Sequence, residues 1–341
     1  MAKTPDNWEP METRKIQKVG GGTYTVSIPA QWAKEHNIEA AETAYLYTHS
    51  DGSLVVRWNE KEHSDLATIQ IALTDTNPRV AERMLHAAYT AGFKRITLRS
   101  QDGLTSEQRR AITDCTRRLT GVEISEETDC YVTIQYLLDA SDVSIRQSLL
   151  QLQCITLSMH EAVTAFVAGE TDESDYIINR DNEADRIYWL ITRHFNRALL
   201  ELAELDQLGV TRPQLFEYYV TARQLERIAD HAAKIVRCAN RTNHAISEEL
   251  LPEVRSISAD TRQVVEDASD AVVNDTPTDV AHSALNRCEQ VVQEARRLDQ
   301  TLVERAPEDA YVLTRMLDSL IRIAKSGGNI AELRLQSSLR I

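Results

Sequence analysis

From Val143 to its end the chain consists of two similar halves, and this internal repeat limits the possible folds more than any other feature. In the first half, Leu-Glu-Arg-Ile-Ala-Asp-His at 225–231 is followed by Lys-Ile at 234–235. In the second half, Leu-Ile-Arg-Ile-Ala-Lys-Ser at 320–326 is followed by Asn-Ile at 329–330. Ile-Asn-Arg-Asp at 178–181 and Leu-Asn-Arg-Cys at 285–288 correspond in the same way. Self-similarity of this kind indicates a tandem duplication.

Each half reads as three long helices, without any clear strand pattern. The expected ranges are about 143–168, 171–202 and 212–240, then 247–274, 277–305 and 307–337. Pro213 and Pro307 lie near the starts of the third and sixth ranges, where proline is favoured. Long helices with short connections pack as antiparallel neighbours. The sequence therefore predicts an all-α bundle of two three-helix repeats.

The first part of the chain, from about Thr13 to Trp58, has the pattern of a small β-rich module. Strands are expected at 23–28, 44–47 and 53–58, with one short helix at 29–36. The three glycines at 20–22 and the Asp-Gly pair at 51–52 are turn signals. A module of this size holds too little core to be stable alone, so we expect two chains to dimerise through it.

A different rhythm occupies the middle of the chain. Strand and helix patterns alternate at 67–73 (strand), 77–92 (helix), 94–98 (strand) and 106–119 (helix), and two strands follow at 122–126 and 131–136. This order predicts a small sheet covered by two helices. The sequence shows no site chemistry in this segment.

The formal net charge of −14 is the most unusual feature of the composition. An acidic composition with little Lys resembles that of proteins from salt-loving archaea. Taken alone, the net negative charge of the chain argues against a nucleic-acid partner. The five cysteines are scattered and form no CxxC pair, so we expect reduced thiols. No apolar run reaches the roughly 18 residues of a membrane span, and the N-terminus has no signal-peptide core. We therefore expect a cytoplasmic protein without stable membrane insertion.

Two pairs of carboxylates form the candidate metal site. Asp181 and Asp185 are four residues apart, as are Glu226 and Asp230, so each pair shares one helix face. Such like-charged pairs repel by roughly 0.2–0.5 kcal/mol when exposed, and a bound cation would relieve the repulsion. Oxygen ligands suit Mg²⁺ or Mn²⁺, and carboxylate clusters also hold iron. His231 points about 100° away from Asp230 on a helix, which favours a packed or surface histidine over a ligand.

Two alternatives to this metal site stay open. The acids can instead form ion pairs on a solvated face with three basic neighbours, Arg223, Arg227 and Lys234. The second repeat replaces all four carboxylates, by Cys288, Val292, Ile321 and Lys325 respectively. This joint loss predicts at most one metal site, in the first repeat, and it also permits a vestigial site.

These residues carry a family resemblance. The stretch 225–235 resembles the PhoU signature, with Ala229 in place of a glycine, and the acidic run 181–186 resembles a second PhoU motif. Members of this family are phosphate-signalling regulators that often bind metals on their helix surfaces. The resemblance therefore implies a regulatory role in phosphate uptake for the helical part.

The N-terminal module resembles a second family. Arg-Lys-Ile-Gln-Lys-Val-Gly-Gly at 14–21 followed by Tyr-Thr-Val-Ser-Ile-Pro at 24–29 is similar to a SpoVT/AbrB-type swapped-hairpin domain, a dimeric DNA binder. Ala-Ala-Glu at 40–42 departs from the Gly-Asp turn of that family. In full order the chain is similar to archaeal PhoU-domain phosphate-uptake regulators. The expected domains are 1–62 (swapped hairpin), 63–140 (α/β segment), 141–242 (first PhoU-like repeat) and 243–341 (second, degenerate repeat).

Four basic residues are the candidate DNA contacts: Arg14, Lys15, Lys18 and Lys34. Between Glu12 and Lys34 they outnumber acids, and a swapped dimer would double the patch. Alternatively, they protect a strand edge from aggregation.

The sequence favours a regulator over an enzyme. It contains no GK[ST] phosphate loop, no GxSxG and no HExxH, and its candidate ligand helices carry no Glu-x-x-His pair. Three non-catalytic functions remain. The chain is a DNA-binding transcriptional regulator of phosphate transport, an adaptor that docks on a phosphate transporter or kinase, or an antitoxin-like partner binder.

Overall fold

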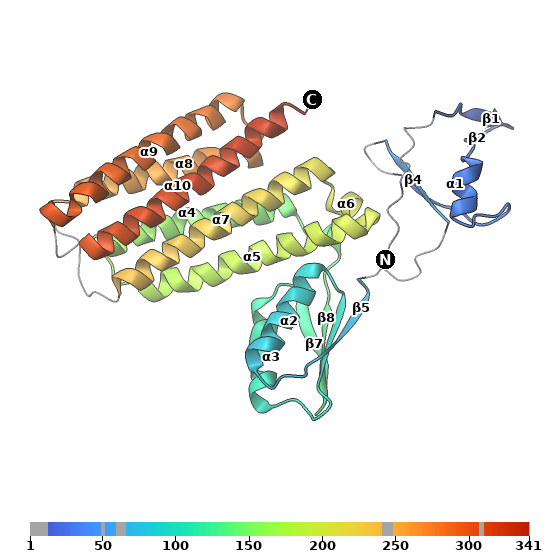
Figure 1. Cartoon of the computed structure of the whole chain (residues 1–341), viewed down its shortest axis with the longest axis horizontal. Helices are drawn as coiled ribbons and strands as arrows, with labels where there is room; N and C mark the ends of the chain where they lie inside the picture. The colour runs from blue at the N-terminus through green and yellow to red at the C-terminus, as the bar shows by residue number, and fades with distance from the viewer. Residues whose placement is uncertain (1–12, 49–51, 59–65, 241–247, 307–309, 341) are drawn as a thin grey trace. The chain divides into compact units, whose positions relative to one another are not determined.

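The chain divides after Glu62 into two units, residues 1–62 and 63–341. The computed structural model, drawn in Figure 1, describes residues 13–48, 52–58, 66–240, 248–306 and 310–340. In the described ranges no helix is long and apolar enough to cross a membrane.

The described residues of the N-terminal unit form two small antiparallel sheets and one short helix. β1 (Gln17–Val19) pairs with β2 (Thr23–Thr25), and β3 (Tyr45–Thr48) pairs with β4 (Leu54–Arg57). α1 (Ala30–Glu35) lies between them in the sequence and follows Pro29. The turn from β1 to β2 uses Gly20 at φ +65°, a backbone conformation that glycine adopts without a steric cost. β2 ends three residues before the predicted strand end, because 26–28 pair with no other strand among the described residues.

No described side chain of this unit is buried. Ile16, Tyr24 and Leu46 are 72%, 67% and 63% exposed, which is unusual for large apolar residues in a folded module. Trp32 stacks on His36 at 4.4 Å and meets Trp58 edge-on at 6.0 Å, and these rings are its main internal packing. The described residues of a single copy therefore form no hydrophobic core. A swapped hairpin requires two chains, so it stays a prediction.

The second unit begins with a four-stranded sheet. Its elements are β5 (Thr68–Ala72), α2 (Pro78–Ala91), β6 (Arg95–Arg99), α3 (Ser106–Arg118), β7 (Val122–Glu127) and β8 (Tyr131–Tyr136). The strand order is β5-β6-β8-β7, with β5 parallel to β6 and the other neighbours antiparallel. Figure 1 shows α2 and α3 together on one face. The predicted small sheet covered by two helices is confirmed.

Local capping explains where the two helices begin. Asn77 accepts a hydrogen bond from the backbone N–H of Arg79, and Pro78 occupies the first turn of α2. α3 begins at Ser106, as predicted, and its cap is Thr105, because Thr105 and Gln108 exchange hydrogen bonds in a capping box. Gln108 also donates to the carbonyl of Asp75, which ties α3 to the loop before α2.

Six long helices follow in the described residues, in agreement with the prediction. They are α4 (Ile145–Val167), α5 (Ser174–Leu200), α7 (Arg212–Ala239), α8 (Leu251–Val273), α9 (Thr278–Arg305) and α10 (Ala310–Ser338). One short helix, α6 (Leu202–Leu208), was not expected; it ends at Gly209, which has a left-handed φ of +65°. In the described residues from Val143 to Arg340 there is no strand.

The helices form two sets of three, as the internal repeat predicts. α4, α5 and α7 pack on one another, as do α8, α9 and α10, and the sets meet through α7 with α10 and α4 with α8. Two glycines on α10 permit close packing in the second set. A Cβ on Gly327 would lie 2.9 Å from Cγ1 of Val264, and one on Gly328 would lie 3.3 Å from Sγ of Cys288.

The sheet and the helical bundle share a polar joint on α5. Arg193 is fully buried, donates from Nη1 to the carbonyl of Tyr89 at 2.8 Å, and lies 3.8 Å above the ring of Tyr136. Arg197 donates from Nη1 to the carbonyl of Gly92 at 2.8 Å. Side chains of α5 thus bond to the end of α2, which fixes the α/β segment against the bundle.

Glu204 on α6 completes this joint. Its carboxylate accepts from Nε of Arg197 at 3.0 Å and contacts Nδ1 of His194 at 2.6 Å. The other ring nitrogen of His194 lies 3.1 Å from the hydroxyl of Tyr136. Burial raises the pKa of Glu204, but the hydrogen bonds and charges of His194 and Arg197 outweigh it and hold this pKa below its usual value.

Candidate functional site

The structure brings the four carboxylates of the first repeat together. Asp181 and Asp185 lie on α5, while Glu226 and Asp230 lie on the neighbouring α7. Each of the four is partly buried. We call these four residues the acidic cluster.

Small apolar residues place the cluster at the edge of the core. Ala222, Ala229 and Ala233 are fully buried on the inner face of α7, as the helical spacing predicts. Arg223, Arg227 and Lys234 are exposed on its outer face. Glu226 therefore lies on the border between the core and the solvent.

Burial and mutual repulsion make this cluster costly to ionise. Burial, followed by the charges of Asp181, Glu226 and Asp230, raises the pKa of Asp185 to about 7. Burial also raises the pKa of Glu226, with smaller contributions from Asp230 and Asp181. The pKa of Asp181 is raised for the same first reason, although its hydrogen bond from Arg237 acts in the opposite direction.

Two members of the cluster are held by cations. Nζ of Lys234 lies 2.6 Å from Oδ2 of Asp230, one helical turn away. Nη2 of Arg237 donates to Oδ2 of Asp181 at 3.0 Å. The ion-pair alternative is thus present for Lys234, whereas Arg223 and Arg227 act on Glu226 only through their charges. Asp185 forms no hydrogen bond or ion pair within the described part of the chain.

A metal ion would require some rearrangement of these side chains. Across the described ranges, no three His, Cys, Asp or Glu side chains are arranged to hold a metal ion. The charges of the acidic cluster suit a hard cation, but Lys234 and Arg237 would have to release Asp230 and Asp181 first. The metal site therefore stays a prediction.

The equivalent positions of the second repeat form a different environment. Cys288 donates from Sγ to the carbonyl of Ala324 at 3.2 Å, and burial raises the pKa of its thiol. Ile321 is partly buried and Lys325 is exposed. The second repeat thus has partly buried, uncharged side chains and one exposed cation where the first repeat has carboxylates.

A pocket beside the acidic cluster was not apparent from the sequence. It has a volume of about 490 Å³ between α2, α3 and α5, and it is lined by Arg79, Glu82, Arg83, His86, Cys115, Arg118, Asp185 and Trp189. His86 meets Trp189 edge-on at 4.5 Å. The signal for this pocket was the spacing of Arg79, Arg83 and His86 along one face of a helix.

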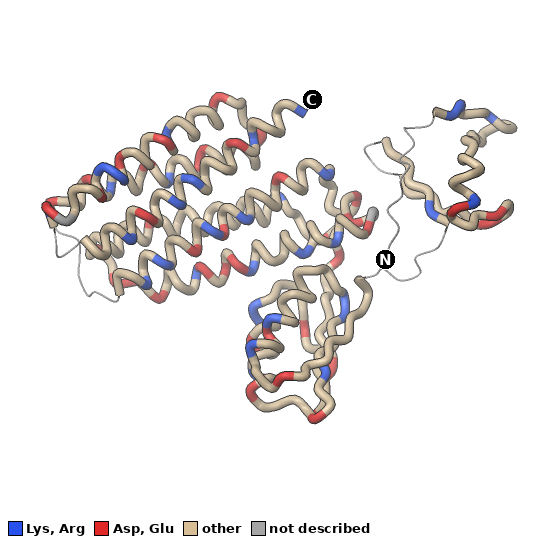
Figure 2. The backbone as a smooth tube through the Cα atoms, in the orientation of Figure 1, with Lys and Arg blue, Asp and Glu red and all other residues tan. Residues whose placement is uncertain are grey.

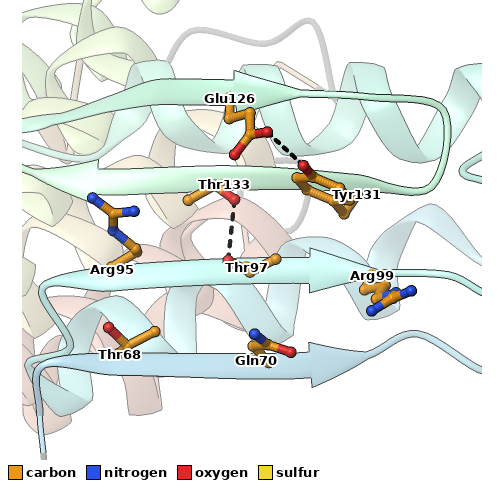
Figure 3. Close-up of a pocket in the computed structure, with 8 residues that line it drawn as sticks. All are labelled: Thr68, Gln70, Arg95, Thr97, Arg99, Glu126, Tyr131 and Thr133. Atoms are coloured by element: carbon orange, nitrogen blue, oxygen red, sulfur yellow. Dashed lines mark hydrogen bonds between the residues drawn. The ribbon is translucent and has the colours of Figure 1, made fainter.

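The uncovered face of the sheet carries a second polar hollow (Figure 3). Its volume is about 450 Å³, and it is lined by Thr68, Gln70, Arg95, Thr97, Arg99, Glu126, Tyr131 and Thr133. Oγ1 of Thr97 lies 3.1 Å from Oγ1 of Thr133, and the hydroxyl of Tyr131 donates to Glu126 at 2.5 Å. Alternate residues of a strand share a face, so the spacing of Arg95, Thr97 and Arg99 in the sequence indicates a polar face of the sheet.

The four candidate DNA contacts all lie on the surface of the N-terminal unit. Arg14 and Lys15 precede β1, Lys18 lies within β1, and Lys34 is in the last turn of α1. All four side chains are exposed. The positions of Lys and Arg residues along the backbone are blue in Figure 2, and those of Asp and Glu are red. The role of the four candidate contacts in binding DNA stays a prediction.

Comparison with known proteins finds a family match for part of the helical bundle. Residues 150–239 match the PhoU domain family. Among solved structures, the chain is similar to the crystal structure of PhoU from Pseudomonas aeruginosa, with 23% identity and a TM-score of 0.49 over 58% of this chain and 96% of that chain. No curated protein matches the chain. The acidic cluster thus lies in a segment that matches the PhoU domain family.

Proposed function

We propose that this chain is a non-catalytic regulator of phosphate uptake, in which the helical part responds to phosphate status and the N-terminal unit binds DNA. The observation that carries the proposal is the match of residues 150–239 to the PhoU domain family. The match covers the helices that hold the acidic cluster, so it concerns the part of the chain with the most perturbed carboxylates.

The features of the N-terminal unit support DNA as its partner. It is a separate unit, and Arg14, Lys15 and Lys18 are exposed beside or within one hairpin strand. Phosphate contacts from such residues supply the sequence-independent part of DNA affinity. A local basic patch matters here, because the chain as a whole has a net charge of −14.

A homodimer through the N-terminal unit is the second part of the proposal. The described residues of the unit bury no side chain, while Ile16, Tyr24 and Leu46 are mostly exposed. A second copy would cover these apolar side chains and supply the missing core. Pairing would also bring two sets of basic residues onto one assembly.

A divalent or iron cation at the acidic cluster is the third part. Burial and, after it, repulsion from three neighbouring carboxylates raise the pKa of Asp185, and a bound cation would offset both effects. The test is calorimetric titration of the full-length protein with Mn²⁺, Mg²⁺ and Fe²⁺. We expect binding in the wild type and a loss of at least tenfold in Asp185→Asn. Equal affinity in both proteins would exclude Asp185 as a ligand.

The deciding experiment compares DNA binding of the full-length protein with that of the triple variant Arg14→Ala, Lys15→Ala, Lys18→Ala. The probes are upstream regions of phosphate-transport genes, at low and high salt. A second triple variant, Arg110→Ala, Arg296→Ala, Arg297→Ala, is the matched control, because it removes three exposed cations from the helices of the other unit.

We expect sequence-specific binding by the wild type and the control, and its loss in the first triple variant with the dimer intact. Absence of binding by the wild-type dimer would refute DNA recognition. The net acidic charge would then favour the alternative, an adaptor that docks on a phosphate transporter or kinase through the helical bundle.

A further inference from the structure

The groove between α7 and α10 carries an excess of positive charge in a strongly acidic protein. Its volume is about 580 Å³, and it is lined by His231, Lys234, Arg237, Cys238, Tyr311, Arg315, Asp318, Ser319 and Arg322. Four of these residues are Lys or Arg and only one is a carboxylate. We call this hollow the cationic groove; the basic residues of both helices are blue in Figure 2.

Three of the four cations are oriented by single carboxylates. Lys234 pairs with Asp230 and Arg237 with Asp181, both in the acidic cluster. Nε of Arg322 lies 3.1 Å from Oδ2 of Asp318. An ammonium has three donors and a guanidinium has five, so each head keeps further N–H groups for a ligand. All three side chains are about half exposed, at 51%, 46% and 59%, so a ligand in the groove can reach them.

Arg315 is the groove cation that pairs with no acid among the described residues. Its guanidinium lies 5.9 Å from the centre of the Tyr311 ring, and within the described ranges no carboxylate is within ion-pair distance. Asp and Glu outnumber Lys and Arg by 52 to 38 in this chain, so most exposed arginines are expected to find an acidic partner on the surface. Surface ion pairing therefore does not explain the position of Arg315. No hydrogen bond between described residues occupies its five donors, so they can bind an anion.

The spacing of the cations indicates an elongated anion. Arg315 and Arg322 are seven residues apart, about 10 Å along one wall, with Ser319 between them. Lys234 and Arg237 are one turn apart on the opposite wall. A single phosphate group is too short to engage this whole row, whereas linked phosphate groups match it. Arginine also binds phosphate oxygens in a bidentate manner that lysine cannot reproduce.

We propose that the cationic groove binds a chain of two or three linked phosphate groups, carried by inorganic polyphosphate or by a nucleoside polyphosphate. Arg315 and Arg322 bind the phosphate oxygens from α10, and Lys234 and Arg237 bind them from α7. The site rests on α7 and α10 alone and goes beyond regulation through DNA. Its binding test and the DNA test above can therefore fail independently.

The test is isothermal titration of the full-length protein in metal-free buffer at 0.1 M salt, which removes any cation bridge from the acidic cluster. The probes are tripolyphosphate, ATP, orthophosphate and sulfate. The variants are Arg315→Gln and Arg322→Gln, with Arg296→Gln as the matched control, since Arg296 is an exposed arginine on α9 outside the groove. Circular dichroism of each variant checks that the helices are intact.

We expect tripolyphosphate to bind with an affinity that falls about tenfold or more in each groove variant and less than twofold in the control. ATP that binds as tightly as tripolyphosphate identifies the phosphate chain as the whole determinant, and tighter ATP identifies a nucleotide ligand; both support the proposal. Binding of orthophosphate or sulfate as tight as that of tripolyphosphate would overturn it, as would no binding or equal loss in the control.

Discussion

Replacing Asp185 by Asn should stabilise the protein at neutral and alkaline pH. The ordinary pKa of this carboxyl is 3.8, and in the folded chain burial and three neighbouring carboxylates raise it to about 7. Between these two values the folded chain holds a proton that the unfolded chain has released. The stability of the wild type therefore falls as the pH rises through this interval, and the full cost of ionising Asp185 is present above about pH 7.

The magnitude follows from the size of the shift. A change from 3.8 to about 7 corresponds to about 4 kcal/mol at roughly 1.36 kcal/mol per unit. Asp185 is only partly buried and its repulsion is shared with the rest of the acidic cluster, so solvent screening reduces this to about 1–2 kcal/mol. The substitution removes no hydrogen bond or ion pair that the described residues form. No lost interaction should therefore offset this gain of about 1–2 kcal/mol in the free energy of unfolding.

The assay is urea unfolding of the full-length protein, followed by circular dichroism at pH 5 and pH 8 in the presence of a chelator. We expect the variant to be more stable by about 1–2 kcal/mol at pH 8 and to show a smaller difference at pH 5. Asp172→Asn is the control, because Asp172 is exposed in the loop before α5 and should change stability by less than about 0.5 kcal/mol. A variant less stable than the wild type at pH 8 would refute the repulsion argument.

Three further changes test other parts of the fold. Gly92→Ala should cost about 2–4 kcal/mol in a urea melt, because Gly92 has φ +105° and its Cβ would collide with Cγ of Arg197; unchanged stability would show that the joint can shift freely. Glu204→Gln should cost about 3 kcal/mol at pH 7, since it removes the buried carboxylate that Arg197 and His194 share and leaves Arg197 with Glu201 alone. That deficit should shrink as the pH falls through the lowered pKa of Glu204, and a constant deficit would contradict the assignment. Ile16→Asp should convert the expected dimer to a monomer in sedimentation analysis, and an unchanged mass would place the dimer contact elsewhere.

The long helices could be predicted because their patterns are strong and local. Apolar spacing and Pro213 placed α7 within one residue of its observed end, and the inner position of Ala222 and Ala229 followed from the same spacing. The short α6 was missed because it continues the helical pattern of α5 after a single break at Glu201. Short helices give little periodic signal.

The polar joint on α5 could not be predicted, since its residues look like a solvated helix face. Arg193 and Arg197 are charged and are spaced as ordinary surface pairs are. Only the packing of α2 against α5 buries them, and that contact joins segments about a hundred residues apart. The partner of Asp181 was missed for a related reason. Arg237 lies on a different helix from Asp181, and sequence spacing identifies only neighbours within one helix.

The buried Arg193 also has a consequence for how such a chain can evolve. Its hydrogen-bond acceptor and the aromatic ring beneath it belong to the α/β segment, while its own backbone belongs to the bundle. A gene rearrangement that exchanged either piece alone would leave a desolvated cation without its partners. The α/β segment and the first helical repeat should therefore be inherited together, whereas the N-terminal unit, which ends at Glu62, can be exchanged as a separate module. In relatives that lack the α/β segment, position 193 should carry an apolar or a solvated residue.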